Sequence, residues 1–180
     1  MKKYIAFLRA VNVGGKNKIP MADLKKHFIE LGFEDAVTYL NSGNVIFSSS
    51  LNDQKKITSK IEKMIHEKFN LEIHVLVIDA ESLKEIMKAR PDWWGTDDFF
   101  ANLILIFPGT TFEELYAKVG EPKEGLEKIQ NYKNAVFWSF DRAKYQKTVW
   151  WSKTASAGIN NLVTIRTVGT IEKIISLSEK

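Results

Sequence analysis

One stretch, residues 9–20, concentrates side chains that could bind an anion. It runs Arg-Ala-Val-Asn-Val-Gly-Gly-Lys-Asn-Lys-Ile-Pro, and the first twenty residues of the chain include five Lys or Arg but no Asp or Glu. Gly14 and Gly15 adopt positive φ without steric cost, so the loop can turn several backbone N–H groups inward. A helix starting near Pro20 would add unpaired N–H groups and the positive end of its dipole. The pattern predicts an anion cradle; the alternative is an ordinary strand-to-helix connection whose lysines are solvated.

The elements that would position this stretch follow from hydrophobic periodicity. Pro20 is favoured in the first turn of a helix, Gly32 would end that helix, and Asn52 or Asp53 can cap the next one. The expected elements are a strand at 3–10, a helix at 20–31, strands at 36–40 and 45–47, a helix at 53–69 and a strand at 72–78. This order, βαββαβ, is that of the ferredoxin-like split unit.

The same order recurs in the second half of the chain. Thr111-Phe112-Glu113-Glu114 has the spacing of a capping box, and Lys133-Asn134 is typical of a hairpin turn. The expected elements are a strand at 102–107, helices at 111–119 and 142–155, a hairpin of 126–132 and 135–140, a strand at 162–165 and a last helix capped by Thr167. We therefore predict an α+β fold of two ferredoxin-like repeats with antiparallel sheets, at residues 1–79 and 101–180. A linking helix and an aromatic connection occupy 80–100, and the second repeat carries an added C-terminal helix.

This topology brings the glycine loop beside the turn at residues 41–44. With strands in the order 4-1-3-2, the connection after the first strand and the hairpin between the second and third lie at one end of the sheet. Arg166, near the last helix, is a candidate second anion ligand, or else a surface salt-bridge residue. The predicted ligand-binding residues are Arg9, Asn12, Gly14, Gly15, Lys16, Asn17, Lys18, Ser42, Asn44 and Arg166.

The chemistry of that set favours binding over catalysis. It is rich in hydrogen-bond donors and holds no carboxylate or histidine, so it lacks an evident general base or an activated nucleophile. His27, His66 and His74 follow no metal-ligand spacing, and we predict no metal and no cofactor.

Composition narrows the class of protein. The net charge is +4 and the pI about 9.1, which is mildly basic and compatible with a phosphate-bearing partner. The sequence contains no Cys, which excludes disulfides and thiolate nucleophiles and favours a cytoplasmic location. No apolar run approaches the roughly 18 residues of a membrane span, and no signal peptide is expected at the N-terminus.

The aromatic and apolar runs carry further expectations. Residues 4–8 and 103–107 are apolar at successive positions, so both faces of each sheet should be covered, unlike the free sheet face of an RNA-recognition domain. Trp93-Trp94 with Phe99-Phe100 could stack on bases or sugars, or pack in a core between the halves. Of Trp150 and Trp151, adjacent on a helix, one should face the core and the other away from it.

Three N-terminal motifs resemble a widespread bacterial family of about this chain's length, catalogued as a conserved domain of unknown function. They are Phe-Leu-Arg-Ala-Val-Asn-Val-Gly-Gly-Lys-Asn-Lys at 7–18, Met-Ala-Asp-Leu at 21–24 and Tyr-Leu-Asn-Ser-Gly-Asn-Val-Ile-Phe at 39–47. The resemblance implies a cytosolic α+β protein with duplicated ferredoxin-like halves, and it implies no activity.

The C-terminal motif of that family is only partly present. The family pattern is Thr-x-Arg-Asn-Trp-Asn-Thr; Thr164, Arg166 and Thr170 match it, whereas residues 167–169 read Thr-Val-Gly. Any role of the family's Asn-Trp-Asn is therefore not carried over to this chain.

Three functions stay open from the sequence. The leading hypothesis is a protein that binds a phosphate-bearing ligand, either a nucleotide or a nucleic-acid backbone, at the glycine loop. The second is an enzyme acting on a small anionic substrate, with Arg9, Lys16 and Arg166 as anion clamps. The third is a structural or protein-interaction module. The sequence leaves the oligomeric state undetermined.

Overall fold

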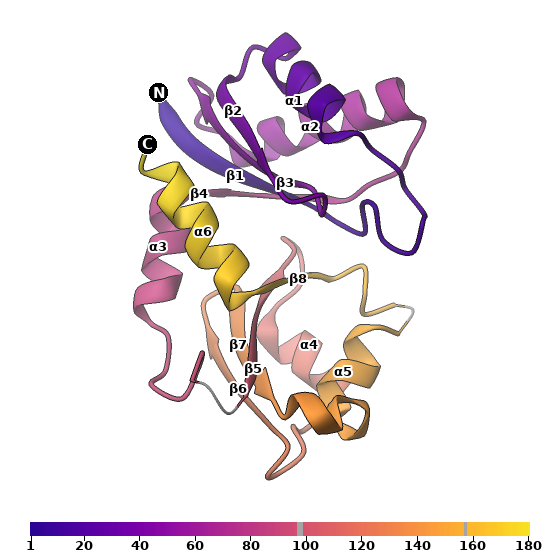
Figure 1. Ribbon diagram of the computed structural model, residues 1–180, viewed down its shortest axis with the longest axis vertical. Helices are drawn as coiled ribbons and strands as arrows, with labels where there is room; N and C mark the ends of the chain where they lie inside the picture. The colour runs from indigo at the N-terminus through magenta and orange to yellow at the C-terminus, as the bar shows by residue number, and fades with distance from the viewer. Residues whose placement is uncertain (97–98, 157) are drawn as a thin grey trace. The chain divides into compact units, whose positions relative to one another are not determined.

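The computed structural model describes residues 1–96, 99–156 and 158–180, which form two compact units (Figure 1). The first unit comprises Met1–Lys84 and Lys173–Lys180, and the second comprises Glu85–Glu172. Each unit contains a four-stranded antiparallel sheet with helices between its strands. The predicted α+β class with two ferredoxin-like repeats is confirmed.

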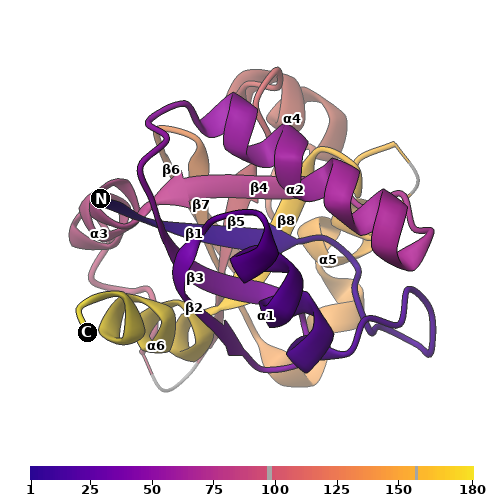
Figure 2. The same cartoon turned by 90° about the horizontal axis from the view of Figure 1, so that it is seen from above.

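The first unit has the strand order β2-β3-β1-β4, as expected. Its elements are β1 (Lys2–Leu8), α1 (Met21–Glu30), β2 (Glu34–Tyr39), β3 (Asn44–Ser49), α2 (Gln54–Phe69) and β4 (Val75–Asp79). Seen from above, α1 and α2 lie across one face of this sheet (Figure 2). Because β1 is central and its last five residues are buried, the loop that leaves it starts inside the sheet.

Alternation along β1 builds the core of the first unit. Tyr4, Ala6 and Leu8 pack in a cluster with apolar side chains of α1 and α2. Ile5 and Phe7, which point to the opposite face, are also 0% exposed. The expectation that both faces of this strand are covered is confirmed.

The fourth strand is shorter than its apolar pattern suggested. It begins at Val75, whereas the sequence pattern placed its start at Glu72. Asn70 ends α2 in the left-handed conformation with φ 54°, and Glu72 is exposed, with its carboxylate 2.8 Å from His66 Nδ1. The chain therefore joins the sheet only where Val75 pairs with Leu8.

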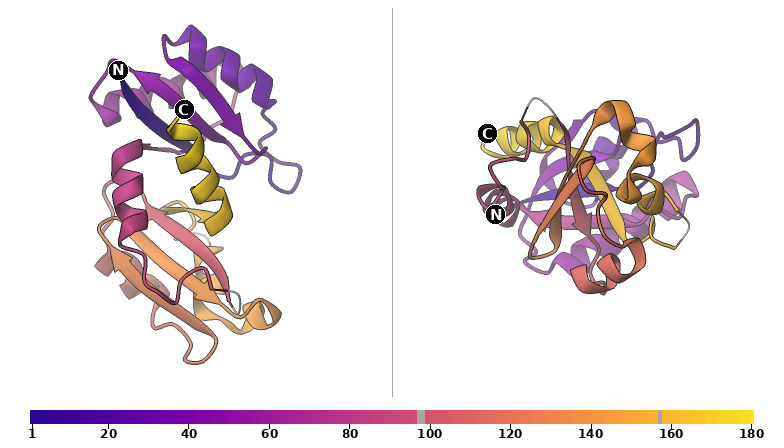
Figure 3. Two further views of the ribbon diagram at one scale, coloured as in Figure 1. Left: turned by 60° about the vertical axis from the view of Figure 1, so that its left-hand side comes forward. Right: turned by 90° about the horizontal axis from the view of Figure 1, so that it is seen from below.

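The second unit has the equivalent order, β6-β7-β5-β8. Its elements are β5 (Phe100–Ile106), α4 (Phe112–Val119), β6 (Glu127–Tyr132), β7 (Ala135–Phe140), the 3₁₀ helix η1 (Arg142–Lys147), α5 (Val149–Thr154) and β8 (Val163–Thr167). Viewed from below, α4 and α5 lie on the same side of this sheet (Figure 3). The two remaining helices are α3 (Ala80–Lys88) and α6 (Val168–Ser178), and the boundary between the units falls within both of them.

The helix expected over 142–155 is interrupted. Thr148 has extended backbone angles, φ −84° and ψ 146°, and separates η1 from α5. Its hydroxyl donates to the Tyr145 carbonyl oxygen at 2.6 Å, and the first N–H groups of α5 bond to the buried carboxylate of Glu127. A continuous helix was the wrong prediction, because the partner that starts α5 lies 22 residues away in the sequence.

Helix capping agrees with the sequence pattern. The Asp53 side chain accepts from the backbone N–H groups of Lys55 and Lys56, which starts α2. Thr111 and Glu114 form the expected capping box of α4, with both reciprocal hydrogen bonds present. Such caps satisfy N–H groups that a helix leaves without partners in its first turn.

The aromatic connection contributes to the core of the second unit. Trp94 is buried, its indole N–H donates to the Asn102 carbonyl oxygen at 3.0 Å, and its ring lies edge-on against Phe137. These contacts favour core packing of Trp94 over a stacking platform. Residues 97–98 of this connection lie outside the described residues.

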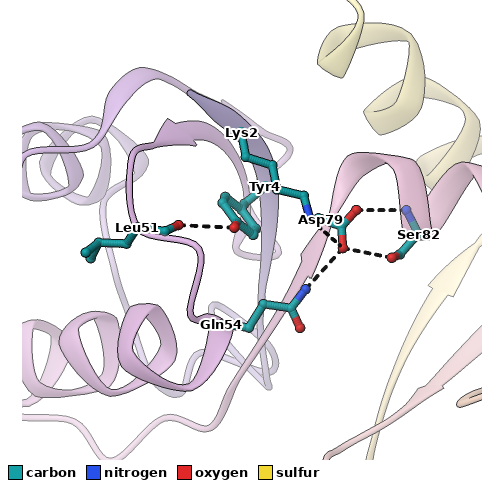
Figure 4. A network of polar contacts seen from close by, with 6 residues as sticks. All are labelled: Lys2, Tyr4, Leu51, Gln54, Asp79 and Ser82. Carbon is teal, nitrogen blue, oxygen red and sulfur yellow. Dashed lines mark hydrogen bonds and ion pairs between the residues drawn. The ribbon is translucent and has the colours of Figure 1, made fainter.

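A polar network in the first unit centres on Asp79, at the end of β4 (Figure 4). Its carboxylate accepts from the Ser82 hydroxyl at 2.7 Å, the Ser82 backbone N–H at 3.0 Å and the Gln54 amide at 3.2 Å, and Lys2 Nζ lies 3.6 Å away. Burial acts to raise the pKa of Asp79, but the Ser82 hydrogen bonds and Lys2 outweigh it and hold that pKa below its ordinary value. The carboxylate therefore starts α3 in its ionised form.

We expect Asp79→Asn to destabilise the protein by about 1 kcal/mol at pH 7, because the charge-assisted hydrogen bonds and the Lys2 pair are lost. A carboxyl whose folded pKa is lowered stabilises the fold above its unfolded pKa of about 3.9, and that contribution disappears as pH falls through the folded pKa. Urea unfolding of both proteins between pH 7 and pH 2 should show the difference shrinking at low pH. Asp92→Asn, at an exposed site, serves as the control; a difference independent of pH would contradict the assignment.

Within the described residues, no helix is long and apolar enough to cross a membrane.

Candidate functional site

The glycine pair forms the tip of a small hairpin in the loop between β1 and α1. Gly14 and Gly15 have φ of 57° and 75°, and Val13 and Lys16 form an isolated antiparallel bridge with Lys16 N–H donating to Val13 O at 3.0 Å. Two consecutive residues with positive φ make the tight turn that suits a two-residue hairpin. The N–H of Lys16 is thus used inside the loop, and α1 begins five residues further on, at Met21.

The base of this loop is held by two asparagine side chains. Asn12 donates from Nδ2 to the carbonyl oxygens of Ile19 at 2.9 Å and Asn41 at 2.8 Å, and its Oδ1 accepts from the Ile19 N–H at 2.9 Å. Asn17 donates from Nδ2 to Ala10 O at 3.0 Å. Asn12 and Asn17 therefore shape the site, because their side-chain amides are engaged by the backbone.

The β2–β3 turn meets this loop as the topology predicted. The Leu8 N–H donates to Gly43 O at 2.8 Å, and Asn12 reaches Asn41 O. Asn44 is fully buried and donates to Tyr39 O at 2.9 Å and to the Ser42 hydroxyl at 3.0 Å, so it stabilises the turn from inside. Ser42, partly exposed, lies in the turn itself.

An open hollow of about 420 Å³ lies where the loop, the turn and the first turn of α1 meet. Pro20 is the N-cap of α1, has extended backbone angles and offers no side-chain hydrogen bond to the helix. The residues that line the hollow are Asn12, Gly15, Lys18, Ile19, Pro20, Met21 and Asn41. Four lining residues, Ile19, Pro20, Met21 and Asn41, were absent from the predicted set, although the turn position of Asn41 and the helix-start position of Pro20 were both evident in the sequence.

Two lysines supply positive charge at the hollow and next to it. Lys18 lines it, Lys16 lies in the adjoining turn, and both side chains are exposed and form no ion pair with any described residue. Arg9 is half-buried, and burial lowers the pKa of its guanidinium from the ordinary value. In the first turn of α1, Asp23 is the acidic residue.

Arg166 belongs to the second unit and is absent from the lining of the hollow. It lies in β8 opposite Leu103, and its Nη1 donates to the Thr164 hydroxyl at 3.0 Å and to Ile165 O at 2.9 Å. Burial lowers the pKa of its guanidinium to about 10. The hollow of the first unit is therefore formed without this residue.

The chain is similar to known proteins in both sequence and fold. A family model described as a protein of unknown function, DUF1697, matches residues 1–137, which include the loop, the turn and α1. The solved structure of a conserved bacterial protein from Streptococcus pneumoniae matches at 26% sequence identity, with 98% of each chain covered and a TM-score of 0.86. No curated protein matches the chain. Five of the seven lining residues lie in the motifs at 7–18, 21–24 and 39–47, and the chain that carries these motifs belongs to the DUF1697 family of proteins of unknown function.

Proposed function

We propose that this protein binds a phosphate group, carried by a nucleotide or a nucleic-acid backbone, in the hollow at the N-terminus of α1. The observation that carries the proposal is the open hollow of about 420 Å³ onto which an uncapped helix start and Lys18 face. The first N–H groups of a helix have no partner within the helix, and the positive end of the dipole favours an anion beside them.

The charge around the hollow supports this ligand class. Lys16 and Lys18 are exposed cations that are not neutralised by a described acidic partner, so either can approach a phosphate without breaking an existing ion pair. The backbone hydrogen bonds of Asn12 fix the shape of the loop before a ligand arrives. A preorganised loop spends less free energy on ordering when it binds.

The lining favours binding over catalysis. Among the described residues that line the hollow, none carries a carboxylate or an imidazole, and Lys18 is the titratable one. Proton transfer requires a group within hydrogen-bond reach of the reacting atom.

We also propose that the protein is cytoplasmic, since a chain without Cys needs no oxidising compartment.

The test compares two double variants of the first unit. We expect Lys16→Ala/Lys18→Ala to weaken binding of pyrophosphate, of adenosine nucleotides or of a labelled RNA by about tenfold, as expected for the loss of two charge contacts. Calorimetry for the small ligands and fluorescence anisotropy for RNA give the affinities. Lys55→Ala/Lys56→Ala on α2 removes the same charge elsewhere and should leave them almost unchanged. Equal effects of the two variants would show that the hollow is not the site.

A further inference from the structure

A strongly basic surface segment lies in the second unit, on η1 and α5. Residues 141–153 hold four cations and one acidic residue. That residue, Asp141, bonds to the Ala143 N–H at 2.9 Å and pairs with Lys144 at 3.2 Å. The exposed cations are Arg142, Lys144, Lys147 and Lys153. The segment therefore presents a net positive charge that suits a polyanion.

Partly exposed aromatic rings lie within this segment and beside it. Trp151 is 41% exposed, whereas its neighbour Trp150 is fully buried, as expected for adjacent positions on a helix. The ring centroid of Trp151 lies 4.7 Å from that of Tyr145 and 5.7 Å from that of Phe140. Phe140 in turn lies 5.6 Å from Phe100. We give the name aromatic strip to the partly exposed Phe100 and Tyr145, the exposed Trp151, and the buried Phe140 that contacts both Phe100 and Trp151.

A cation already lies on this strip. The guanidinium carbon of Arg142 is 5.3 Å from the ring centroid of Phe100, within the range of a cation–π contact. Arg142 can thus donate to a phosphate while its guanidinium stays over the ring. The strip combines flat apolar surface with positive charge.

The helix that carries Trp151 is fixed to the sheet. The buried carboxylate of Glu127 accepts from the backbone N–H groups of Val149 and Trp150 at 2.6 and 3.2 Å, and from the Trp138 indole N–H at 3.1 Å. The Trp150 indole N–H donates to Gly120 O at 3.1 Å. Trp151 therefore keeps its position without a partner, which reduces the cost of ordering on binding.

We infer that this surface binds single-stranded nucleic acid, with bases against the exposed ring surface of Trp151 and phosphates on the neighbouring cations. Single strands offer free base faces to aromatic side chains, whereas a duplex hides them in its stack. An acidic protein segment would use the cations but would leave the rings without a matching flat group. The inference does not depend on the proposed function, because no residue of this surface lines the hollow.

Fluorescence anisotropy with a labelled 20-nucleotide homopyrimidine strand tests it on the full chain. We expect Trp151→Ala to weaken binding at least about fivefold, as for loss of one stacking contact. Trp151→Phe, which keeps a ring, should retain most of the affinity, and Trp93→Ala serves as the matched tryptophan control. Circular dichroism of each variant checks that the fold is retained.

The cations are tested in the same assay. Arg142→Ala/Lys147→Ala/Lys153→Ala should reduce both the affinity and its dependence on salt, whereas Lys55→Ala/Lys56→Ala/Lys63→Ala on α2 should have a much smaller effect. The loss caused by Trp151→Ala should be the same in the wild-type chain and in a Lys16→Ala/Lys18→Ala background, which separates the surface from the hollow. Equal affinity for a duplex of the same sequence, equal effects of the two triple variants, or full displacement by polyglutamate at matched charge would overturn the inference.

Discussion

Gly43→Ala should destabilise the first unit by about 3–5 kcal/mol, from a strained backbone and a steric clash. Gly43 has φ 74°, a conformation that costs an L-residue roughly 1–2 kcal/mol. A Cβ at this position would lie 2.6 Å from the Leu8 Cβ and 3.4 Å from the Val11 Cβ. Both neighbours are buried, and a Cβ cannot move without its backbone, so the turn would have to separate from β1.

Gly15→Ala is a closely matched control for this prediction. Gly15 has φ 75°, but a Cβ there meets no atom within 4 Å. The backbone cost should therefore be common to both variants, and the difference between them measures the close approach of the turn to β1. Urea unfolding gives the two free energies. If Gly43→Ala were no more destabilising than Gly15→Ala, the packing of this turn against Leu8 would be wrong.

The candidate site was only partly predictable from the sequence. The apolar alternation of β1 and the turn residues at 41–44 predicted the topology, because strand order follows from local patterns and short connections. The roles of Asn12 and Asn44 were not predictable. Both are polar residues in loop motifs, and only the folded chain shows that their amides bind backbone carbonyl oxygens.

The conformation of the loop at Gly14 and Gly15 was also only partly predictable from the sequence. Positive φ at Gly14 and Gly15 followed from residue type, but two such residues form either an anion-binding nest or a hairpin tip. The bridge between Val13 and Lys16 selects the hairpin. The anion-binding groups that the structure offers are then the uncapped start of α1 and the lysines, with the glycines setting the path of the loop.

In the second unit, the break between η1 and α5 depends on a contact between residues far apart in the sequence. The periodicity of 142–155 is helical throughout, so the break at Thr148 has no local signal. The break is caused by Glu127, which is the first residue of the edge strand β6. Most glutamates are solvated, but Glu127 is 3% exposed and accepts hydrogen bonds from the start of α5. By accepting from the first N–H groups of α5, the buried carboxylate allows a new helix to begin after Thr148 where the sequence pattern predicts an uninterrupted one.

Glu127→Ala should therefore destabilise the second unit by about 4 kcal/mol, since it leaves buried and partly buried N–H groups without an acceptor at roughly 1–3 kcal/mol for each buried one. Its carboxylate serves the N–H groups of Lys123, Val149 and Trp150 and the indole of Trp138. Glu127→Gln is nearly isosteric but replaces one acceptor oxygen with an NH₂ donor, so it should also destabilise, by about half as much.

Glu124→Ala removes the same charge three positions earlier at an exposed site and should change stability by less than about 0.5 kcal/mol. Thermal unfolding gives the global effect, and hydrogen exchange of peptides covering residues 149–154 gives the local one. Exchange there should accelerate in Glu127→Ala and stay unchanged in Glu124→Ala, because only Glu127 holds the first turn of α5. Unaltered exchange in both would mean that α5 begins at Thr148 for a reason other than this carboxylate, and that Trp151 owes its fixed position to the aromatic contacts alone.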